Sequence, residues 1–303
     1  MTRSIGVVIA GVVWGLVLAG AAKAEPAPPE AAAQSTVAPV VTITGHPQPP
    51  KDLPQAVSNF VETHVGPVRF DHLSRWRTPI CPITVGLPGA YDTFITARIR
   101  SVAASVRAKV DANPKCTPNV QVIFSPEPQK LLDEIAAKHS DLLGYHYLSE
   151  THRLAMVHHT IQAWYVTATA NGRMEIVDNP YNPTVSGAAG SRLGDGLHSV
   201  FVLVTIVVDG DKVVDRTIGP VSDYIAFLAL TNVKALEDCS EVPTIMNIMI
   251  EGCAHADQIT SLTDFDLAYL RALYTTDPGG FTSFQRSSMS RLILEDMKQT
   301  AKH

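Results

Sequence analysis

Apolar residues recur along this chain with two periods, one typical of helices and one typical of strands. From residue 53 onward, the spacing of Val57, Phe60 and Val61 predicts a helix over 54–64. Two β-branched runs then predict strands, each followed by a stretch with helical spacing. These four elements are expected, in chain order, at 80–86, 90–110, 120–124 and 126–138. We therefore expect a β-α-β-α opening in which the two strands are parallel neighbours.

The middle of the chain combines alternating apolar positions with turn residues. Asn171-Gly172 and Asp209-Gly210-Asp211 are typical of the turns that join antiparallel strands. The expected elements are a short helix over 150–156, a hairpin of strands 161–170 and 174–177, a long loop over 178–198, and a second hairpin of strands 201–208 and 212–217. The loop is rich in Asn, Pro and Gly, and long ordered loops are often functional.

The last third of the chain has helical spacing only. Four helices are expected, over 220–230, 243–250, 263–274 and 283–297. Thr263 is predicted to cap the third of them, with Asp264 and Asp266 complementing the helix dipole. Together these patterns predict an α+β (mixed α/β) fold, with a twisted mixed sheet, packed helices and an all-helical C-terminal part.

The first 24 residues have the pattern of a secretory signal peptide. Arg3 precedes an uncharged apolar run over 5–19, and Ala22-Lys23-Ala24 is a small-x-small cleavage site. An uncleaved anchor is the alternative, but the run is shorter than the ~20 residues that a span needs. We expect a signal peptide over 1–24, a Pro/Ala-rich linker over 25–54 and a single globular domain over 55–303, with its β-α-β-α half at about 55–140 and its later strands and helices at about 160–298.

Composition and charge favour an ordinary globular protein outside the cytoplasm. Apolar residues make up 46% of the 303 residues, which is ample for a core, and the formal net charge is −5. Without a basic patch, binding to nucleic acid is not expected. The apolar run over 200–208 has the length of a strand, so no stable membrane span is expected after signal cleavage, and the location is predicted to be periplasmic or secreted.

The four cysteines are an even number in a chain predicted to be exported, which indicates two disulfides. Three pairings are possible. We favour Cys81 with Cys116 and Cys239 with Cys253, because each pair encloses a compact unit. A metal site is the alternative, but the wide spacings contain no C-x-x-C.

Motifs that carry catalysis are not evident in the sequence. There is no G-x-S-x-G nucleophile elbow and no Gly-Lys-Ser/Thr phosphate loop. Several histidines occur, but none forms the H-x-x-x-H pair that a zinc helix uses. We therefore assign no catalytic residue, no metal site and no cofactor, and an enzyme is not the favoured interpretation.

The C-terminal third contains the sequence Leu262-Thr263-Asp264-Phe265-Asp266-Leu267-Ala268-Tyr269-Leu270-Arg271-Ala272-Leu273-Tyr274. With this sequence, residues 200–276 resemble an uncharacterised family of exported bacterial proteins, which in turn resembles the zincin fold of metallopeptidases. The zincin helix with its H-E-x-x-H motif corresponds in order to Ser222-Asp223-Tyr224-Ile225-Ala226-Phe227-Leu228-Ala229-Leu230. Ser222 and Ala226 then stand at the zinc ligands and Asp223 at the catalytic glutamate. The resemblance thus implies the fold and argues against the activity.

Three functions stay open on the sequence. The favoured one is a non-catalytic zincin-like domain that binds an envelope protein or a small ligand in a cleft under helix 220–230, with Ser222, Asp223 and Tyr224 as candidate cleft residues. The first alternative is a peptidase-like hydrolase whose metal site is rearranged and drawn from His152, His158, His159, His198 or His255. The second is a structural or assembly factor of the envelope, tethered by the Pro/Ala-rich segment.

Overall fold

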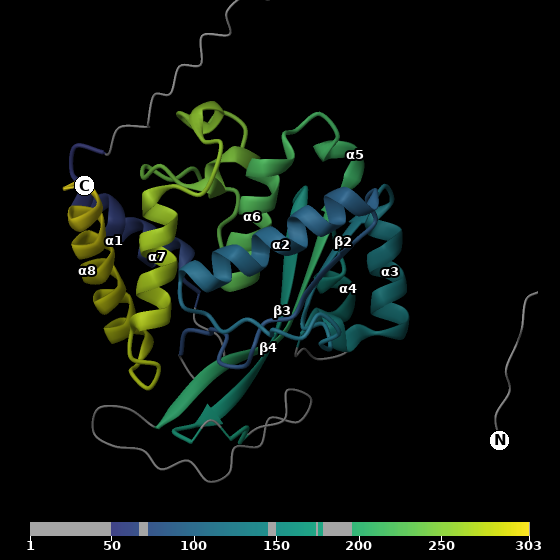
Figure 1. The fold of residues 1–303 in the computed structure, drawn as a ribbon, viewed down its shortest axis with the longest axis horizontal. Coiled ribbons are helices and arrows are strands. Elements are labelled where there is room, and N and C mark those ends of the chain that lie inside the picture. Colours follow the sequence, from purple (N-terminus) through teal and green to yellow (C-terminus); the bar gives the residue numbers. More distant parts are fainter. Residues whose placement is uncertain (1–49, 67–71, 145–149, 174, 178–195, 303) are drawn as a thin grey trace, which may run out of the picture. The chain divides into compact units, whose positions relative to one another are not determined.

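The computed structural model describes residues 50–66, 72–144, 150–173, 175–177 and 196–302 (Figure 1). All of them belong to one compact unit. The predicted signal peptide, nearly all of the predicted linker and most of the predicted loop over 178–198 lie outside the described residues.

A mixed sheet forms the centre of the fold, as the sequence predicts, and in the described residues it has four strands. Its strands are β1 (Pro82–Val85), β2 (Val120–Ser125), β3 (Ile161–Asn171) and β4 (Leu197–Asp209), in the spatial order β1-β2-β4-β3. β1, β2 and β4 run parallel to one another, whereas β3 runs antiparallel to β4. The predicted parallel pairing of the first two strands is confirmed, and Pro82 lies opposite Val120 in its register.

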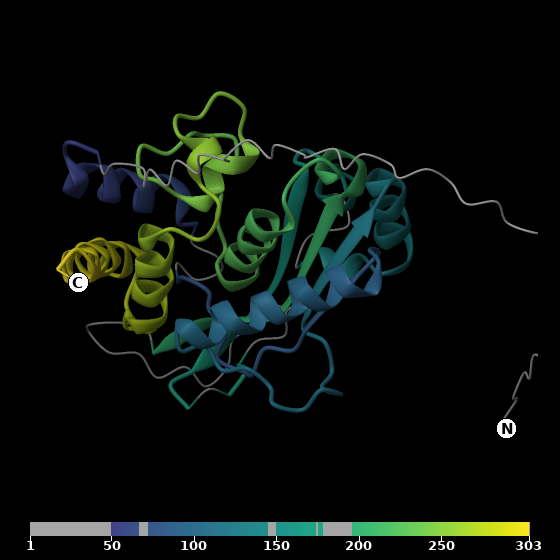
Figure 2. The ribbon, with the colours of Figure 1, turned by 45° about the horizontal axis from the view of Figure 1, so that its top comes forward.

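Helices cover both faces of this sheet. α2 (Gly89–Ser105) connects β1 to β2 and packs with α6 (Ile218–Leu230) on one face (Figure 2). α3 (Pro128–Lys138) and α4 (Thr151–Leu154) pack on the other face. Alternation along β4 separates the two layers, because Ile206 packs into the large core while Val207 joins the small cluster under α3. The β-α-β-α opening is therefore confirmed.

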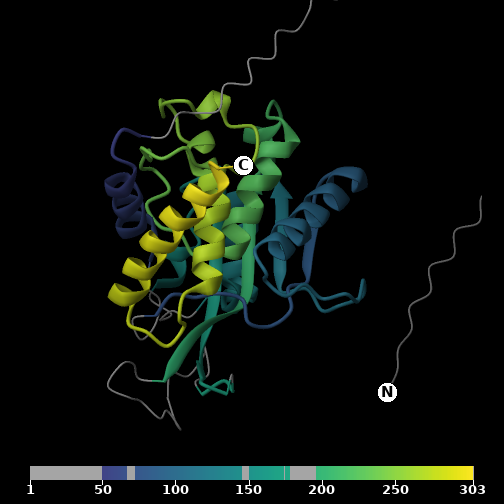
Figure 3. The same ribbon diagram turned by 60° about the vertical axis from the view of Figure 1, so that its left-hand side comes forward.

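After β4 the described chain is helical, as predicted for the C-terminal part. The elements are α5 (Gly210–Val213), α6, the 3₁₀ turns η4 (Ile245–Met249) and η5 (Ala256–Gln258), α7 (Asp264–Thr275) and α8 (Thr282–Thr300). α1 (Leu53–His64) comes first in the chain but packs against α8, the last helix (Figure 3). Phe60 of α1 also meets the rings of Phe265 and Tyr269 on α7 edge-on, with centroids 4.8 and 5.5 Å apart.

The predicted hairpin of strands 201–208 and 212–217 is wrong. β4 begins at Leu197 and pairs with β3 on one side and β2 on the other, so no return strand is needed. At Asp209 the chain turns into α5, and the Asp209 carboxylate accepts the backbone N–H of Lys212. The β-branched pair Val213 and Val214 resembles a strand in sequence, but the cap at Asp209 directs it into a helical turn.

Three predicted helices are markedly shorter than expected, and one predicted strand is only a bridge. The helix over 150–156 is reduced to the single turn α4. The helix over 90–110 ends at Ser105, because Arg107 takes a left-handed φ of 63° and Val110 pairs with Ile80. The segment over 243–250 forms only the 3₁₀ turn η4. Of the strand predicted over 174–177, residue 174 lies outside the described residues, and Ile176 makes one antiparallel bridge to Ala170.

Both predicted disulfides are present. Cys81 and Cys116 are joined with their Cα atoms 6.0 Å apart, and Cys239 and Cys253 with theirs 5.4 Å apart. Such bonds persist in oxidising compartments. Among the residues that the structure describes, none of the helices combines the length and apolarity that a bilayer crossing requires.

Candidate functional site

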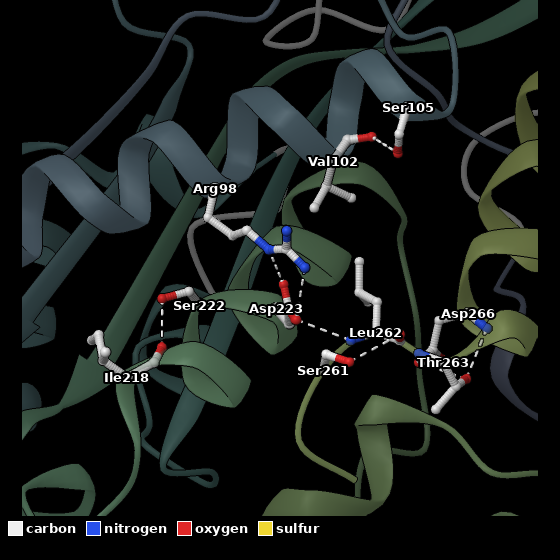
Figure 4. A network of polar contacts seen from close by, with 10 residues as sticks. All are labelled: Arg98, Val102, Ser105, Ile218, Ser222, Asp223, Ser261, Leu262, Thr263 and Asp266. Carbon is white, nitrogen blue, oxygen red and sulfur yellow. Dashed lines mark hydrogen bonds and ion pairs between the residues drawn. The ribbon is translucent and has the colours of Figure 1, made fainter. Parts of the chain in front are cut away.

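Asp223, the central candidate cleft residue, forms an ion pair in the interior (Figure 4). Its side chain on α6 is 3% exposed, and both of its oxygens accept from Arg98 of α2, with Nη2 3.0 Å from Oδ2. The backbone N–H of Leu262 donates to the same Oδ2 at 2.9 Å. The hydrogen bonds from Arg98 to the Asp223 carboxylate raise the pKa of Arg98. Asp223 therefore joins α2, α6 and the chain entering α7.

The other two candidate cleft residues are also buried. Ser222 donates its hydroxyl to the carbonyl of Ile218 one turn earlier, at 2.6 Å. Tyr224 is 2% exposed and lies in the main core, where burial raises the pKa of its phenol. The polar groups of Ser222 and Asp223 thus form hydrogen bonds within the protein. That any of the three contacts a ligand stays a prediction.

The cap of α7 is more elaborate than the sequence predicts. Thr263 caps α7, as predicted, and it also forms a reciprocal capping box with Asp266. Asp266, however, is fully buried and also accepts from Thr244 Oγ1 and the N–H of Ile245. Burial raises the pKa of Asp266 to about 6, against the opposing effect of these hydrogen bonds. It is a structural carboxyl that fastens the 240s loop to α7.

The histidines considered for a rearranged metal site lie in different parts of the fold. His158 and His159 precede the start of β3, which pairs with the end of β4, whereas His198 lies at the start of β4. The ten residue steps of β4 from His198 to Val208 span about 30 Å. His152 lies on α4 and His255 precedes η5. In the described ranges, no three His, Cys, Asp or Glu side chains are grouped so that they could hold a metal ion.

A pocket of about 290 Å³ lies at the turn between α7 and α8. Its described lining residues are Thr276, Asp277, Gly280, Phe284, Gln285 and Ser288. Phe284 is 68% exposed, and its neighbour Phe281 stacks on His72 with ring centroids 6.4 Å apart. The volume is at the lower limit of ordinary ligand pockets, so it suits a small molecule with an apolar part.

An extended segment over 72–76 passes behind this turn and fixes it to the sheet. Arg75 forms a parallel bridge with Val200 of β4, and the N–H of Leu73 donates to Gln285 Oε1 at 2.9 Å. Trp76 Nε1 donates to the carbonyl of Ala229 on α6 at 2.7 Å. The segment therefore contacts the sheet, α6 and α8 within five residues.

Arg75 is the largest side chain that is fully buried in the described chain, with 1% exposure. Its Nη1 donates to the carbonyl of Thr276, a pocket-lining residue, at 2.5 Å. Its Nε and Nη2 are buried and have no hydrogen-bond partner in the described structure. Burial, assisted by the charge of Arg77, lowers the pKa of Arg75 to about 10. Unsatisfied buried polar groups of this kind require an explanation.

His198 adds a second unsatisfied polar atom to the same region. Its Nδ1 is buried and has no partner in the described structure. Its ring lies against the turn, since a Cβ added at Gly279 would be 3.5 Å from His198 Nε2. Burial and the charges of Arg77 and Arg75 lower the pKa of His198, whereas Asp277 raises it. The pocket turn is thus backed by a group of basic side chains.

Sequence reasoning selected His198 as a possible metal ligand but missed Arg75. Nothing in Ser74-Arg75-Trp76 distinguishes this arginine from a surface residue. The one local signal was Asp277-Pro278-Gly279-Gly280, which is typical of a turn between two helices. Ser222, Asp223 and Tyr224 are not among the described residues that line the pocket.

Comparison of the chain with protein-family models, with curated proteins and with solved structures gives no match.

Proposed function

We propose that this chain is an exported, non-catalytic domain that binds a small ligand in the pocket at the turn between α7 and α8. One observation carries the proposal: the turn between α7 and α8 holds a pocket of about 290 Å³ whose lining includes the exposed aromatic side chain of Phe284.

The chemistry of the chain supports binding rather than turnover. No sequence motif supplies an activated nucleophile. On the zincin-like resemblance, Ala226 has no donor atom, and Ser222 uses its hydroxyl within α6. Asp223, at the position of the catalytic glutamate, is held in an ion pair with Arg98. We interpret the zincin-like core as a scaffold that has kept the architecture without the reaction.

A location in the periplasm or outside the cell belongs to the same proposal. The signal-like pattern over 1–24 and the two disulfides support it, because disulfides form in oxidising compartments. Fractionation of cells that express the full chain, with detection of the mature N-terminus, tests this point separately from ligand binding.

The binding proposal is tested by filling the pocket. Ser288 is half-buried in α8 and lines the pocket, so Ser288→Trp places an indole there. We expect ligand-detected NMR with a set of small aromatic compounds to reveal binders of the full chain that Ser288→Trp no longer binds. Ser287→Trp, on the exposed neighbouring position, is the control and should leave binding unchanged. Stoichiometric zinc in the purified protein, or binding that is unaffected by Ser288→Trp, would contradict the proposal.

A further inference from the structure

We propose that the pocket at the turn between α7 and α8 takes a small organic cation, an amine with a short apolar body, and that the carboxylate of Asp277 binds its ammonium group. This inference rests on the proposed function and adds the chemical class of the ligand. It makes Asp277 the residue that determines which ligands are accepted.

The polar side chains that line the pocket offer a ligand mainly hydrogen-bond acceptors. The hydroxyl of Thr276 donates its one proton to the carbonyl of Ala272 at 2.8 Å, so it can only accept from a ligand. Gln285 uses Nε2 on two carbonyls of the turn and Oε1 on a backbone N–H. Among the described lining side chains, that leaves the hydroxyl of Ser288 as a possible donor. A ligand that donates hydrogen bonds therefore suits this lining better than one that accepts them.

Asp277 supplies the charge at the pocket. Among the described residues that line it, Asp277 is the one with a charged side chain, and that side chain is exposed to solvent. Its Oδ1 accepts the N–H of Gly279 at 3.0 Å, and in the described residues no hydrogen bond is made to Oδ2. An ammonium group provides both the positive charge and the N–H donors that this oxygen can accept.

Phe284 places an aromatic wall on the other side of the same space. Its side chain is 68% exposed, so a ligand can reach the ring. Gly280 lies between Phe284 and Asp277, since a Cβ added at Gly280 would be 3.8 Å from Phe284 Cβ and 4.0 Å from the backbone oxygen of Asp277. An aromatic ring attracts a cation to its face and packs against an apolar body, so it favours the same class of ligand as Asp277.

The positive groups behind the turn oppose a cation less than Asp277 attracts it. Arg75 is buried, is not among the described lining residues, and bonds the carbonyl of Thr276. Burial lowers the pKa of His198 from 6.5, so its ring is mostly neutral at pH 7. Arg77 is exposed, so water and salt screen its charge. The C-terminal end of α7 and the N-terminal end of α8 meet at this turn (Figure 3), and their opposite partial charges offset each other.

The experiment compares three probes of similar shape on the full chain. Benzylamine is a cation at pH 7, benzyl alcohol is its neutral counterpart, and benzoate is an anion. In ligand-detected NMR titrations at low salt, we expect benzylamine to bind about five times more tightly than benzyl alcohol, the upper range for an ion pair in contact with water. Benzoate should bind more weakly than either, and added salt should reduce the preference for benzylamine.

Variants then assign the preference to Asp277. Asp277→Asn removes the charge but keeps an oxygen for the N–H of Gly279, so the benzylamine-to-benzyl-alcohol ratio should fall to about one. Asp264→Asn is the matched control, because Asp264 is an exposed acid in the first turn of α7, at the opposite end of that helix from the pocket. It should keep the wild-type ratio within about twofold.

Each outcome decides between the two proposals. If benzyl alcohol binds as tightly as benzylamine and Ser288→Trp abolishes the binding of both, the cation inference fails and the proposed binding function stands. If benzoate binds most tightly, the ligand is an anion and the inference is wrong. If no probe binds, the proposed function fails as well. If the preference for benzylamine survives in Asp277→Asn, the role given to Asp277 is wrong. The wild-type comparison remains decisive even if a variant does not fold.

Discussion

Replacing Arg75 by methionine should stabilise the ligand-free protein, although most core substitutions destabilise. Burial lowers the pKa of Arg75 from 12.5 to about 10. At 1.36 kcal/mol for each pKa unit, the buried charge destabilises the native state by about 3 kcal/mol. At pH 7 the arginine is protonated in both the native and the unfolded chain, so the whole penalty applies.

The substitution also removes one favourable contact. The hydrogen bond from Nη1 to the carbonyl of Thr276 is lost, at a cost of about 2 kcal/mol. Methionine keeps an unbranched apolar stem in the core. The net expectation for Arg75→Met is a free energy of unfolding higher by about 1 kcal/mol, and a Tm higher by about 2–4 °C for a domain of this size.

Urea unfolding and calorimetry of the disulfide-intact protein measure this difference. Arg100→Met is the control, because it removes a half-buried arginine whose Nη1 donates to the backbone carbonyl of Asp111. It should destabilise by about 1 kcal/mol. If Arg75→Met instead lowers the free energy of unfolding by more than about 1 kcal/mol, Arg75 is a structural residue. The reasoning about an unpaired charge would then be wrong.

Three further predictions concern residues outside the pocket. Arg98→Met should lower the free energy of unfolding by about 3 kcal/mol, because it leaves the buried carboxylate of Asp223 unpaired. Asp223→Ala should cost less, because Arg98 is exposed enough to be solvated when its partner is removed. Urea unfolding of both variants compares them. Burial raises the pKa of Asp266 from 3.8 to about 6, so the folded protein takes up a proton at this residue as the pH falls through 6. The contribution of Asp266 to the free energy of unfolding should therefore decrease by about 3 kcal/mol as the pH rises from 3.8 to about 6. Unfolding of wild type and Asp266→Asn at each pH measures this, and a difference that is constant with pH would contradict it. Replacing Cys81 and Cys116 by serine opens a 35-residue separation and should lower the free energy of unfolding by about 4 kcal/mol; an unchanged denaturation midpoint would show that the loop entropy argument does not apply.

The sequence was sufficient where the determining contacts are local. Amphipathic spacing located α1 and α7 within a residue or two, and the Thr263 cap was visible because its partner lies three positions away. The cysteine pairing followed from loop size and compartment. The strand prediction over 212–217 was wrong because β-branched residues favour strands. Strand propensity does not reveal that β4 already has two neighbouring strands.

The site itself could not be predicted in the same way. Arg75 meets Thr276 across 201 residues, and Asp223 meets Arg98 across 125. An arginine in sequence carries no sign of whether it will be buried or paired, because both depend on which distant elements surround it. The candidate cleft residues were selected by their place in a resemblance. The structure shows that Asp223 joins α2, α6 and the chain entering α7, whereas Ser222 bonds within α6 and Tyr224 lies in the main core.

The segment over 72–76 has a consequence for the order in which this protein can reach its final state. Leu73 bonds to Gln285 across 212 residues, and Trp76 to Ala229 across 153. A polypeptide synthesised from its N-terminus therefore cannot form the bond between Leu73 and Gln285 until α8 has been made. Chains that terminate before α8 should expose this segment to proteases, which provides a built-in check that the whole sequence is present.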